Sequence, residues 1–271
     1  MTGRRTVRRH PPEVLGQLRG QVLSSVGRHG KYLLLGWHDR QVLVAHLRMS
    51  GQMLAANPGD PLVPHTHAVF HFSDVGELRF VDPRTFGELF LAGSPCPSAG
   101  ASRTGQRPKS SVPGLVPGLV LTSSGMQLEG LGADALAATP AHFRSVLAGR
   151  RAPLKALLVD QRVVAGVGNI YADEICFVAR LRPDRPAGDL RPGELRRLSA
   201  ATRSVLEDAI EAGGSTLRDA RYRDVLGKAG FYQLQHRVYG RAGGPCLTCG
   251  TAIERRAIGA KSAYFCPRCQ R

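Results

Sequence analysis

The sequence predicts an α+β protein in which strands come first, helices follow and a small cysteine-rich tail ends the chain. Three observations support this order. Short apolar or alternating runs, bounded by turn residues, recur between Gln21 and Leu91, which is typical of an antiparallel sandwich or barrel. After Gly132 the apolar residues take a helical period. The last 36 residues contain four clustered cysteines.

Each element follows from its local pattern. Strands are predicted at six apolar runs: 21–26, 32–37, 42–47, 69–72, 78–81 and 88–91. From Gly93 to about Ser124 the composition changes to Gly, Pro, Ser, Thr and Arg, which predicts a flexible linker or insertion. Helices are predicted over 142–149, 153–161, 168–179 and 192–212. The expected domains are a sandwich at 1–92, a linker at 93–131, a helical domain at 132–235 and a metal-binding tail at 236–271.

The charge balance points to a polyanionic partner. The 271 residues include 37 Lys and Arg against 21 Asp and Glu, which gives a formal net charge of +16. Such an excess attracts polyanions through steering and counterion release, so nucleic acid is the first partner to consider. A membrane surface or the ribosome is the rival, and an arginine-rich proteome would explain the charge without any function.

Membrane and secreted classes are disfavoured. No apolar run approaches the roughly 18 residues of a membrane span. The N-terminus is polar and basic, with no apolar stretch behind it that would make a signal peptide. We therefore expect a cytoplasmic, nucleoid-associated protein.

The tail has the ligand spacing of a zinc site. Cys246 and Cys249 form one CxxC pair, Cys266 and Cys269 form another, and 16 residues separate the pairs. Two such pairs place four thiolates around Zn²⁺, and a site closed by four cysteines is structural. Two disulfides or a redox pair are the alternatives, but disulfides are improbable without a secretion signal.

Several segments, in order, resemble those of the formamidopyrimidine-DNA glycosylase / endonuclease VIII family of base-excision-repair enzymes. The resemblance covers nearly the whole chain except the 93–124 insertion, and it rests on these segments: 28-RHGKYLLLGW-37, 46-HLRMSGQM-53, 79-RFVDPRTFGELF-90, 150-RRAPLKALLVDQRVVAGVGNIYADE-174, 236-HRVYGR-241 and 266-CPRCQR-271. It implies an N-terminal antiparallel β-sandwich, a helix–two-turn–helix domain and a C-terminal zinc-finger β-hairpin. It also implies double-stranded DNA with an oxidised base or an abasic site as partner, bound by a monomer.

The glycine-rich segment before the third predicted helix can bind a phosphate. Gly166-Val-Gly168-Asn169 at a helix start leaves free amides and the positive end of the helix dipole facing outward. Asn169 can cap the helix and donate to the same phosphate, although alone this pattern is more often an ordinary turn. Arg150 and Lys155 would reach the backbone from the same face, unless Lys155 is only a solvated helix charge.

The resemblance assigns four further residues to the damaged duplex. Met49, Arg84 and Phe86 match the trio that fills the gap left by an extruded nucleotide, since a damaged base cannot be attacked inside the stack. Taken alone, Met49 and Phe86 would more often be core residues. His65 matches a DNA-contacting histidine.

Two lysines are assigned to the chemistry by resemblance. Lys31 matches a sandwich lysine that approaches the lesion and assists β-elimination, although outside the family it would be a solvated charge. Lys261 stands where the family has an arginine near the zinc hairpin; lysine keeps the charge but not the bidentate fork. Asp134 replaces a glutamate of the family pattern.

The start of the chain departs from the family. There the nucleophile is an N-terminal proline in a Pro-Glu-Leu-Pro-Glu opening, whereas this sequence begins Met-Thr-Gly-Arg-Arg. The family pattern implies that about 25 residues, a helix and a strand, are absent. Either the reading frame starts too late and the protein is a working glycosylase, or the chain is an inactive protein that binds damaged DNA.

The expected reaction is excision of oxidised purines or pyrimidines followed by strand cleavage at the abasic site. The loop 218–233 that would cover the base follows no simple code for base preference. Another alternative is a zinc-ribbon protein of translation or transcription, which would share only the charge and the cysteines.

Overall fold

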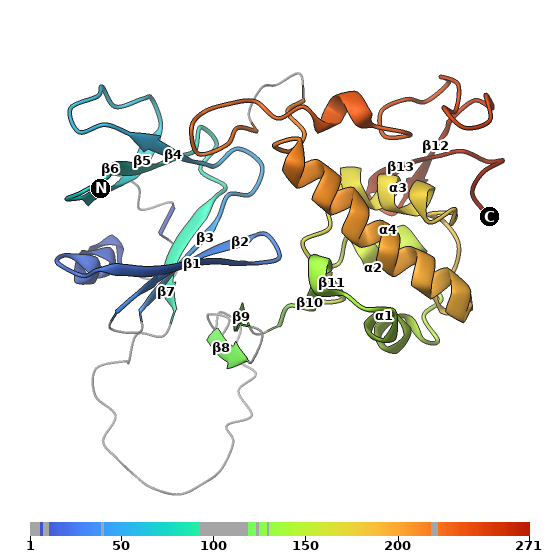
Figure 1. Cartoon of the computed structure of the whole chain (residues 1–271), viewed down its shortest axis with the longest axis horizontal. Coiled ribbons are helices and arrows are strands. Elements are labelled where there is room, and N and C mark those ends of the chain that lie inside the picture. The colour runs from blue at the N-terminus through green and yellow to red at the C-terminus, as the bar shows by residue number, and fades with distance from the viewer. Residues whose placement is uncertain are drawn as a thin grey trace, which may run out of the picture.

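The computed structural model describes residues 6–7, 11–38, 41–92, 119–122, 125–128, 130–217 and 222–271. A strand-rich body holds the first part of the chain and a helical body holds the second, with the zinc-type tail beside the helices (Figure 1). Within these residues, no helix is both long enough and apolar enough to cross a membrane.

The first body consists of two antiparallel sheets. The sheet in the order β1-β2-β3-β7 contains Leu23–His29, Tyr32–Trp37, Val42–His46 and Glu88–Ala92. The sheet in the order β4-β6-β5 contains Gln52–Ala56, Gly76–Val81 and Thr66–Phe72. The predicted antiparallel sandwich is confirmed. The sequence patterns missed β4, whose Gln-Met-Leu-Ala-Ala run lacks the β-branched residues typical of strands.

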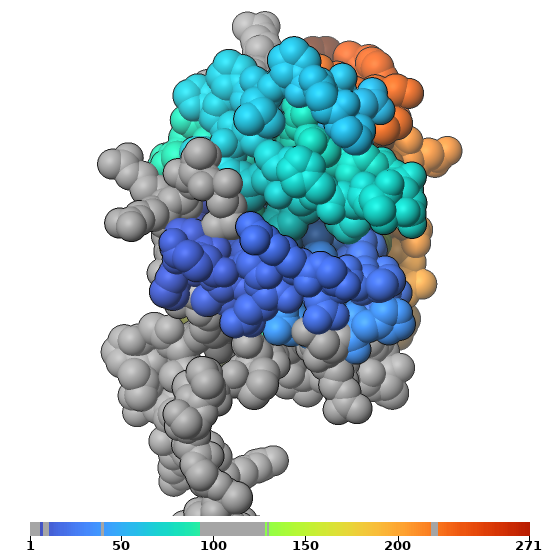
Figure 2. Space-filling model, turned by 90° about the vertical axis from the view of Figure 1, so that its left-hand side faces the viewer, coloured from blue at the N-terminus to red at the C-terminus, as the bar shows by residue number. Residues whose placement is uncertain are grey.

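The sandwich core lies between the two sheets. Leu43, Leu89 and Phe80 are fully buried there, because alternate residues of a strand point to the same face. The 3-10 helix η1 (Pro12–Leu18), also unpredicted, adds Leu15 and Leu18 to this core. Figure 2 shows the end of the molecule that this body forms, with the η1–β1 segment in blue below the cyan and teal strands β4–β6.

A second apolar layer lies on the far side of the larger sheet. Leu34, Val44 and Phe90 pack there against Leu128. Leu128 ends β9 (Gly125–Leu128), which pairs with β8 (Leu119–Thr122) in a hairpin. Part of the predicted linker therefore forms a hairpin, since its short apolar run can pair locally; its residues 93–118 lie outside the described residues.

The second body is a cluster of helices. The main helices are α1 (Pro140–Leu147), α2 (Leu154–Leu158), α3 (Asn169–Val178) and α4 (Pro192–Glu211), joined by the short 3-10 helices η2 (Ala135–Ala137) and η3 (Ala187–Asp189). Their shared core includes Phe143, Leu158 and Ile175, all fully buried. A two-residue parallel pair, β10 (Ala133–Asp134) with β11 (Val164–Ala165), lies at the side of this body that faces the sandwich.

The C-terminal tail packs on α3. It contains η4 (Tyr232–Gln235) and the hairpin β12 (Glu254–Ile258) with β13 (Lys261–Phe265). Phe177 of α3 packs with Val238, Ile253 and Cys266 in a small separate core. The segment after α4 also reaches back to the sandwich, where Val225 accepts a hydrogen bond from the amide of Ala55 at 2.8 Å; the orange segment that crosses between the bodies in Figure 1 makes this contact.

Candidate nucleic-acid interface

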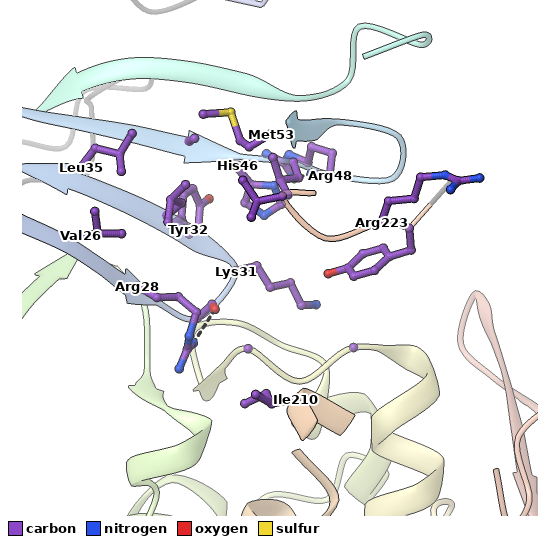
Figure 3. Close-up of a pocket in the computed structure, with 18 of the residues that line it drawn as sticks. Val26, Arg28, Lys31, Tyr32, Leu35, His46, Arg48, Met53, Ile210 and Arg223 are labelled. Atoms are coloured by element: carbon purple, nitrogen blue, oxygen red, sulfur yellow. Dashed lines mark hydrogen bonds between the residues drawn. The ribbon is translucent and has the colours of Figure 1, made fainter. Parts of the chain in front are cut away.

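A cavity of about 990 Å³ opens between the two bodies. The sandwich contributes Lys31, Tyr32 and His46, and the helical body contributes Gly168 and Ile210 (Figure 3). Both walls come from one chain, so a single copy forms the whole cavity.

Lys31 lies at the tip of the β1–β2 hairpin and extends to the segment before α3 (Figure 3). Its Nζ donates to the carbonyl of Val167 at 3.0 Å. Burial in the cavity, together with the positive charges of Lys261 and Arg48, lowers the pKa of Lys31 to about 8. Lys31 therefore loses its proton more easily than an ordinary lysine, and Lys261 is near enough to contribute to this shift.

The hairpin that carries Lys31 is fixed to the helical body. Asp134 accepts a bidentate pair from Arg28 at 2.6 and 2.9 Å and the amide of Gly30 at 2.8 Å. Burial alone would raise the pKa of Asp134, but the hydrogen bonds from Arg28 and Gly30 outweigh it and lower the pKa. Gly30 has φ +57°, and a side chain there would come within 2.8 Å of Ala165. Asp134 therefore attaches the hairpin to the helical body. Its partner Arg28 is a site residue that the sequence patterns missed.

The glycine-rich segment forms the start of α3. Gly166 adopts φ +115°, which favours glycine, and a Cβ at Gly168 would lie 3.4 Å from Nζ of Lys31. The expectation that Asn169 caps the helix is wrong: Gly168 is the N-cap and the helix has no side-chain cap. Asn169 is the first helical residue instead, so the first-turn amides, which have no intrahelical partner, remain available to an anion.

The four residues expected to meet the damaged duplex lie on exposed loops of the sandwich. Met49 is 69% exposed and Phe86 is 47% exposed, so neither is a core residue. Arg84 and His65 are exposed as well. The loops 47–51, 57–65 and 82–87 therefore present them to solvent rather than to the core.

Lys155 does not match its expected place. Its side chain is 1% exposed, forms an ion pair with Asp173 at 2.7 Å and donates to the carbonyl of Ser262. The prediction that Lys155 reaches the DNA backbone is contradicted. Its buried amine is bound inside the protein, by Asp173 of α3 and by the Ser262 carbonyl of the tail hairpin. Arg150, just before α2, is exposed and stays a candidate for phosphate contact.

Two adjacent carboxylates of α3 hold the tail. Glu174 is fully buried and accepts the amides of Arg237, Val238 and Tyr239 at 2.8, 3.0 and 2.9 Å. Asp173 accepts the amide of Tyr264 at 3.1 Å. The tail hairpin, in which Lys261 begins β13, is thereby fixed against the middle of α3.

The four cysteines of the tail come together as expected. The sulfur atoms of Cys246, Cys249, Cys266 and Cys269 all lie within 4.8 Å of one another. The Cys249–Cys266 and Cys246–Cys269 pairs are separated by 3.5 and 3.9 Å. A tetrahedron with Zn–S bonds of about 2.3 Å has edges of about 3.8 Å, so the four thiolates fit Zn²⁺.

Comparison with known proteins gives the family. Three family models match: the formamidopyrimidine-DNA glycosylase N-terminal domain over residues 1–89, the formamidopyrimidine-DNA glycosylase H2TH domain over 130–221, and the zinc finger found in FPG and IleRS over 243–271. The formamidopyrimidine-DNA glycosylase of Symbiobacterium thermophilum is 40% identical over 272 residues, which cover 100% of this chain and 80% of the relative. The chain belongs to the formamidopyrimidine-DNA glycosylase family. The glycosylase of Listeria innocua is 37% identical, with 96% of this chain and 86% of the relative covered.

Solved structures of the family show the same fold. MutM (Fpg) of Thermus thermophilus matches with a TM-score of 0.72 and 42% identity, over 93% of this chain and 84% of that one. Fpg of Lactococcus lactis in complex with DNA containing an abasic site matches with a TM-score of 0.76 and 26% identity, over 98% and 89%. The same protein was solved with DNA containing FAPY-dG, with a TM-score of 0.75. With the zinc-finger match and the sulfur geometry, the tail of this glycosylase-family chain holds one structural Zn²⁺.

Proposed function

We propose that this protein is a base-excision DNA glycosylase with AP lyase activity, which extrudes an oxidised base, removes it and cleaves the strand. The observation on which the proposal depends is the cavity between the two bodies, which is lined by Lys31 and the start of α3 and whose Lys31 amine is influenced by the positive charge of Lys261. Relatives named formamidopyrimidine-DNA glycosylase, and relatives bound to lesion-containing DNA, support the same reaction.

The duplex would be held mainly through its backbone. The free amides of α3 and the exposed Arg150 suit two phosphates near the lesion, because helix starts and arginine side chains both bind phosphate oxygens. The exposed loops of the sandwich would insert Met49, Arg84 and Phe86 into the gap, which offsets the cost of unstacking the base. His65, on a neighbouring loop, would contact the strand.

Lys31 suits the elimination step at the abasic site. A protonated Lys31 would bind the phosphate next to the lesion, and a neutral Lys31 would take the proton that must leave the sugar. With a pKa of about 8, it offers both forms near neutral pH. Lys261 would bind the same phosphate and keep the Lys31 pKa low.

We also propose that the protein acts as a monomer on chromosomal DNA in the cytoplasm. One chain supplies both walls of the cavity, and the net charge of +16 favours accumulation on the nucleoid.

The test is a binding and cleavage assay with zinc-loaded protein and matched duplexes carrying 8-oxoguanine, an abasic site or no lesion. We expect tighter binding to both lesion duplexes and strand cleavage only at the lesion. Borohydride in the same reaction would fix an active lyase covalently to the abasic strand. Preferential binding to the lesion duplexes without cleavage or trapping would show that the protein only binds damaged DNA. Equal affinity for all three duplexes would refute both the glycosylase function and the damage-binding function.

A further inference from the structure

One buried residue, Asp82, contacts all the loops that carry the duplex-facing side chains, through its carboxylate and its backbone. Asp82 directly follows β6 and is 0% exposed. It lies between the loop of Met49, the loop of His65 and the loop of Arg84 and Phe86. Neither the reaction described above nor the zinc site uses this residue.

The side chain of Asp82 joins two of these loops. Its Oδ1 accepts the hydroxyl of Ser50, the residue after Met49, and the amide of Arg84 at 3.2 Å. Its Oδ2 accepts the amide of Gly87, the residue after Phe86, at 2.6 Å. A charged acceptor forms stronger hydrogen bonds than a neutral one, so each loop is held next to the residue that faces the duplex.

The backbone of Asp82 joins the third loop. Its amide donates to the carbonyl of His65 at 3.0 Å. Its carbonyl accepts the amide of Thr85 at 3.2 Å and the ring Nε2 of His67 at 2.8 Å. Five groups from the three loops, together with the ring of His67 on β5, therefore form hydrogen bonds with this one residue.

These loops contain strained backbone that needs such support. His65 and Thr85 have φ of +67° and +54°, a region that residues other than glycine rarely adopt, and Arg48, beside Met49, has φ of +55°. Each of these residues lies within two positions of a duplex-facing side chain.

The close packing around Gly87 leaves the carboxylate little freedom. A Cβ at Gly87 would lie 3.0 Å from Oδ2 of Asp82 and 2.6 Å from the ring of Phe80. The loop can therefore approach the carboxylate this closely only with glycine at this position.

We propose that Asp82 is a positioning residue that fixes Met49, Arg84 and Phe86 relative to one another, so that they enter the duplex as one unit at the gap left by the extruded base. The proposal rests on the proposed function, since it concerns the same site. Asp82 touches no DNA itself; it acts through the three loops. Discrimination between damaged and intact duplexes then depends on this buried carboxylate.

The first variant is Asp82→Asn, which keeps the shape but replaces one charged acceptor oxygen with an amide donor. The readout is the ratio of affinities for an abasic-site duplex and an intact duplex. We expect this ratio to fall about tenfold, which corresponds to the loss of one charge-assisted hydrogen bond. Affinity for intact DNA should stay within about twofold of the wild-type value, because contacts to phosphates supply most of the affinity for undamaged DNA.

The matched control is Glu194→Gln. Glu194 lies at the start of α4 in the helical body, where its carboxylate accepts hydrogen bonds from the side chain of Arg185 and the amide of Arg191 and contacts none of the three loops. We expect its affinity ratio to equal that of the wild type. The melting temperature and zinc content of each variant show that it is folded.

Coupling distinguishes positioning from general damage to the fold. In an Arg84→Ala/Phe86→Ala background, Asp82→Asn should lower the ratio by no more than about threefold, because Met49 is then the one side chain of the three that is left for it to position. Ser50→Ala, which removes only the link to the Met49 loop, should lower the ratio by about threefold and serves as the test if Asp82→Asn fails to fold.

A wild-type ratio in both Asp82→Asn and Ser50→Ala, or an equal loss in the Arg84→Ala/Phe86→Ala background, overturns the positioning role while leaving the proposed function intact. If the unmutated protein does not prefer the abasic duplex, the proposed function itself fails and the positioning role fails with it.

Discussion

At the scale of single residues, the charge state of Lys31 is determined by its surroundings. The hairpin tip places Nζ against the carbonyl of Val167, inside a cavity shared with other cations. Burial and the charges of Lys261 and Arg48 both disfavour the protonated form. The pKa of Lys31 is therefore about 8, which is below that of an ordinary surface lysine.

The rate of strand cleavage at a preformed abasic site should therefore rise with pH. Because the neutral form of Lys31 is the proposed base, we expect kcat/KM to increase about tenfold per unit well below pH 8 and to level off above it. The Lys261→Met variant should shift the midpoint to higher pH, since removing a neighbouring positive charge lets the pKa of Lys31 rise. A pH profile measured on an abasic duplex checks this, and an unchanged midpoint in Lys261→Met would contradict it.

Lys155 and Arg150 should respond differently to removal. Breaking the buried Lys155–Asp173 pair leaves a buried charge without its partner, so Lys155→Ala should cost about 3 kcal/mol or more of unfolding free energy. Arg150→Ala should leave stability within about 0.5 kcal/mol but weaken binding to every duplex and reduce the salt slope by about one. Urea unfolding and salt titrations measure both; a Lys155→Ala protein of wild-type stability would disprove the structural role.

At the scale of elements, the β1–β2 hairpin and the β10–η2 segment form a joint between the two bodies. Arg28, Gly30 and Asp134 meet there, and Asp134 also accepts the amide of Leu136 at the start of η2. The Asp134 carboxylate thus orients the hairpin that presents Lys31. The same carboxylate caps η2 at the start of the helical body.

We expect Asp134→Asn to lower the unfolding free energy by about 1 kcal/mol at pH 7, a modest value because the Arg28 side chain is 43% exposed. The folded pKa of Asp134 is lowered, so its stabilisation is present above the usual value of 3.8 and is lost as pH falls through the folded pKa. The difference between variant and wild type should therefore shrink in acid. Asp160→Asn is the control, since its partner Arg162 is 80% exposed and solvent screens the pair, so its removal should have little effect on stability. An equal effect of both variants would contradict the joint.

At the scale of the whole molecule, the tail depends on its metal and the cleft depends on the tail. The apolar cluster of the tail is small, so the four thiolates and Zn²⁺ supply much of its stability. Glu174 and Asp173 then transmit the tail's position to α3 through backbone amides.

Removing zinc should unfold the tail and lower DNA affinity at least tenfold, while the sandwich and helices stay folded because their cores are separate. Chelation followed by zinc quantification, circular dichroism and a binding assay measures this. Cys266→Ser should behave like the chelated protein, whereas Cys176→Ser, at a buried cysteine of α3 outside the cluster, should keep its zinc. Full DNA affinity in the chelated protein would contradict the prediction.

Patterns that are local in sequence predicted most of the fold. Short apolar runs predicted the strands of the larger sheet, and the two CxxC pairs predicted the zinc site. Contacts between distant residues explain the misses: nothing beside Lys155 in the sequence shows that Asp173 would pair with it, and Asp82 has no pattern that links it to Ser50 or His65. Arg28 and Asp134 are 106 positions apart, so only the folded chain brings them together. The assignments of Lys31, Lys261, His65 and the inserted trio stay predictions until variants are measured.

The joint at Arg28, Gly30, Asp134 and Ala165 limits how this chain can be recombined. Consider a chimera that takes its sandwich from one parent and its helices from another. In it, Asp134 would face a hairpin that pairs with a different acid in its own parent, or a residue larger than Gly30 would face the methyl group of Ala165. The two bodies should therefore be exchanged together with the contacts between them, because a domain swap that ignores these four positions would misplace the Lys31 amine.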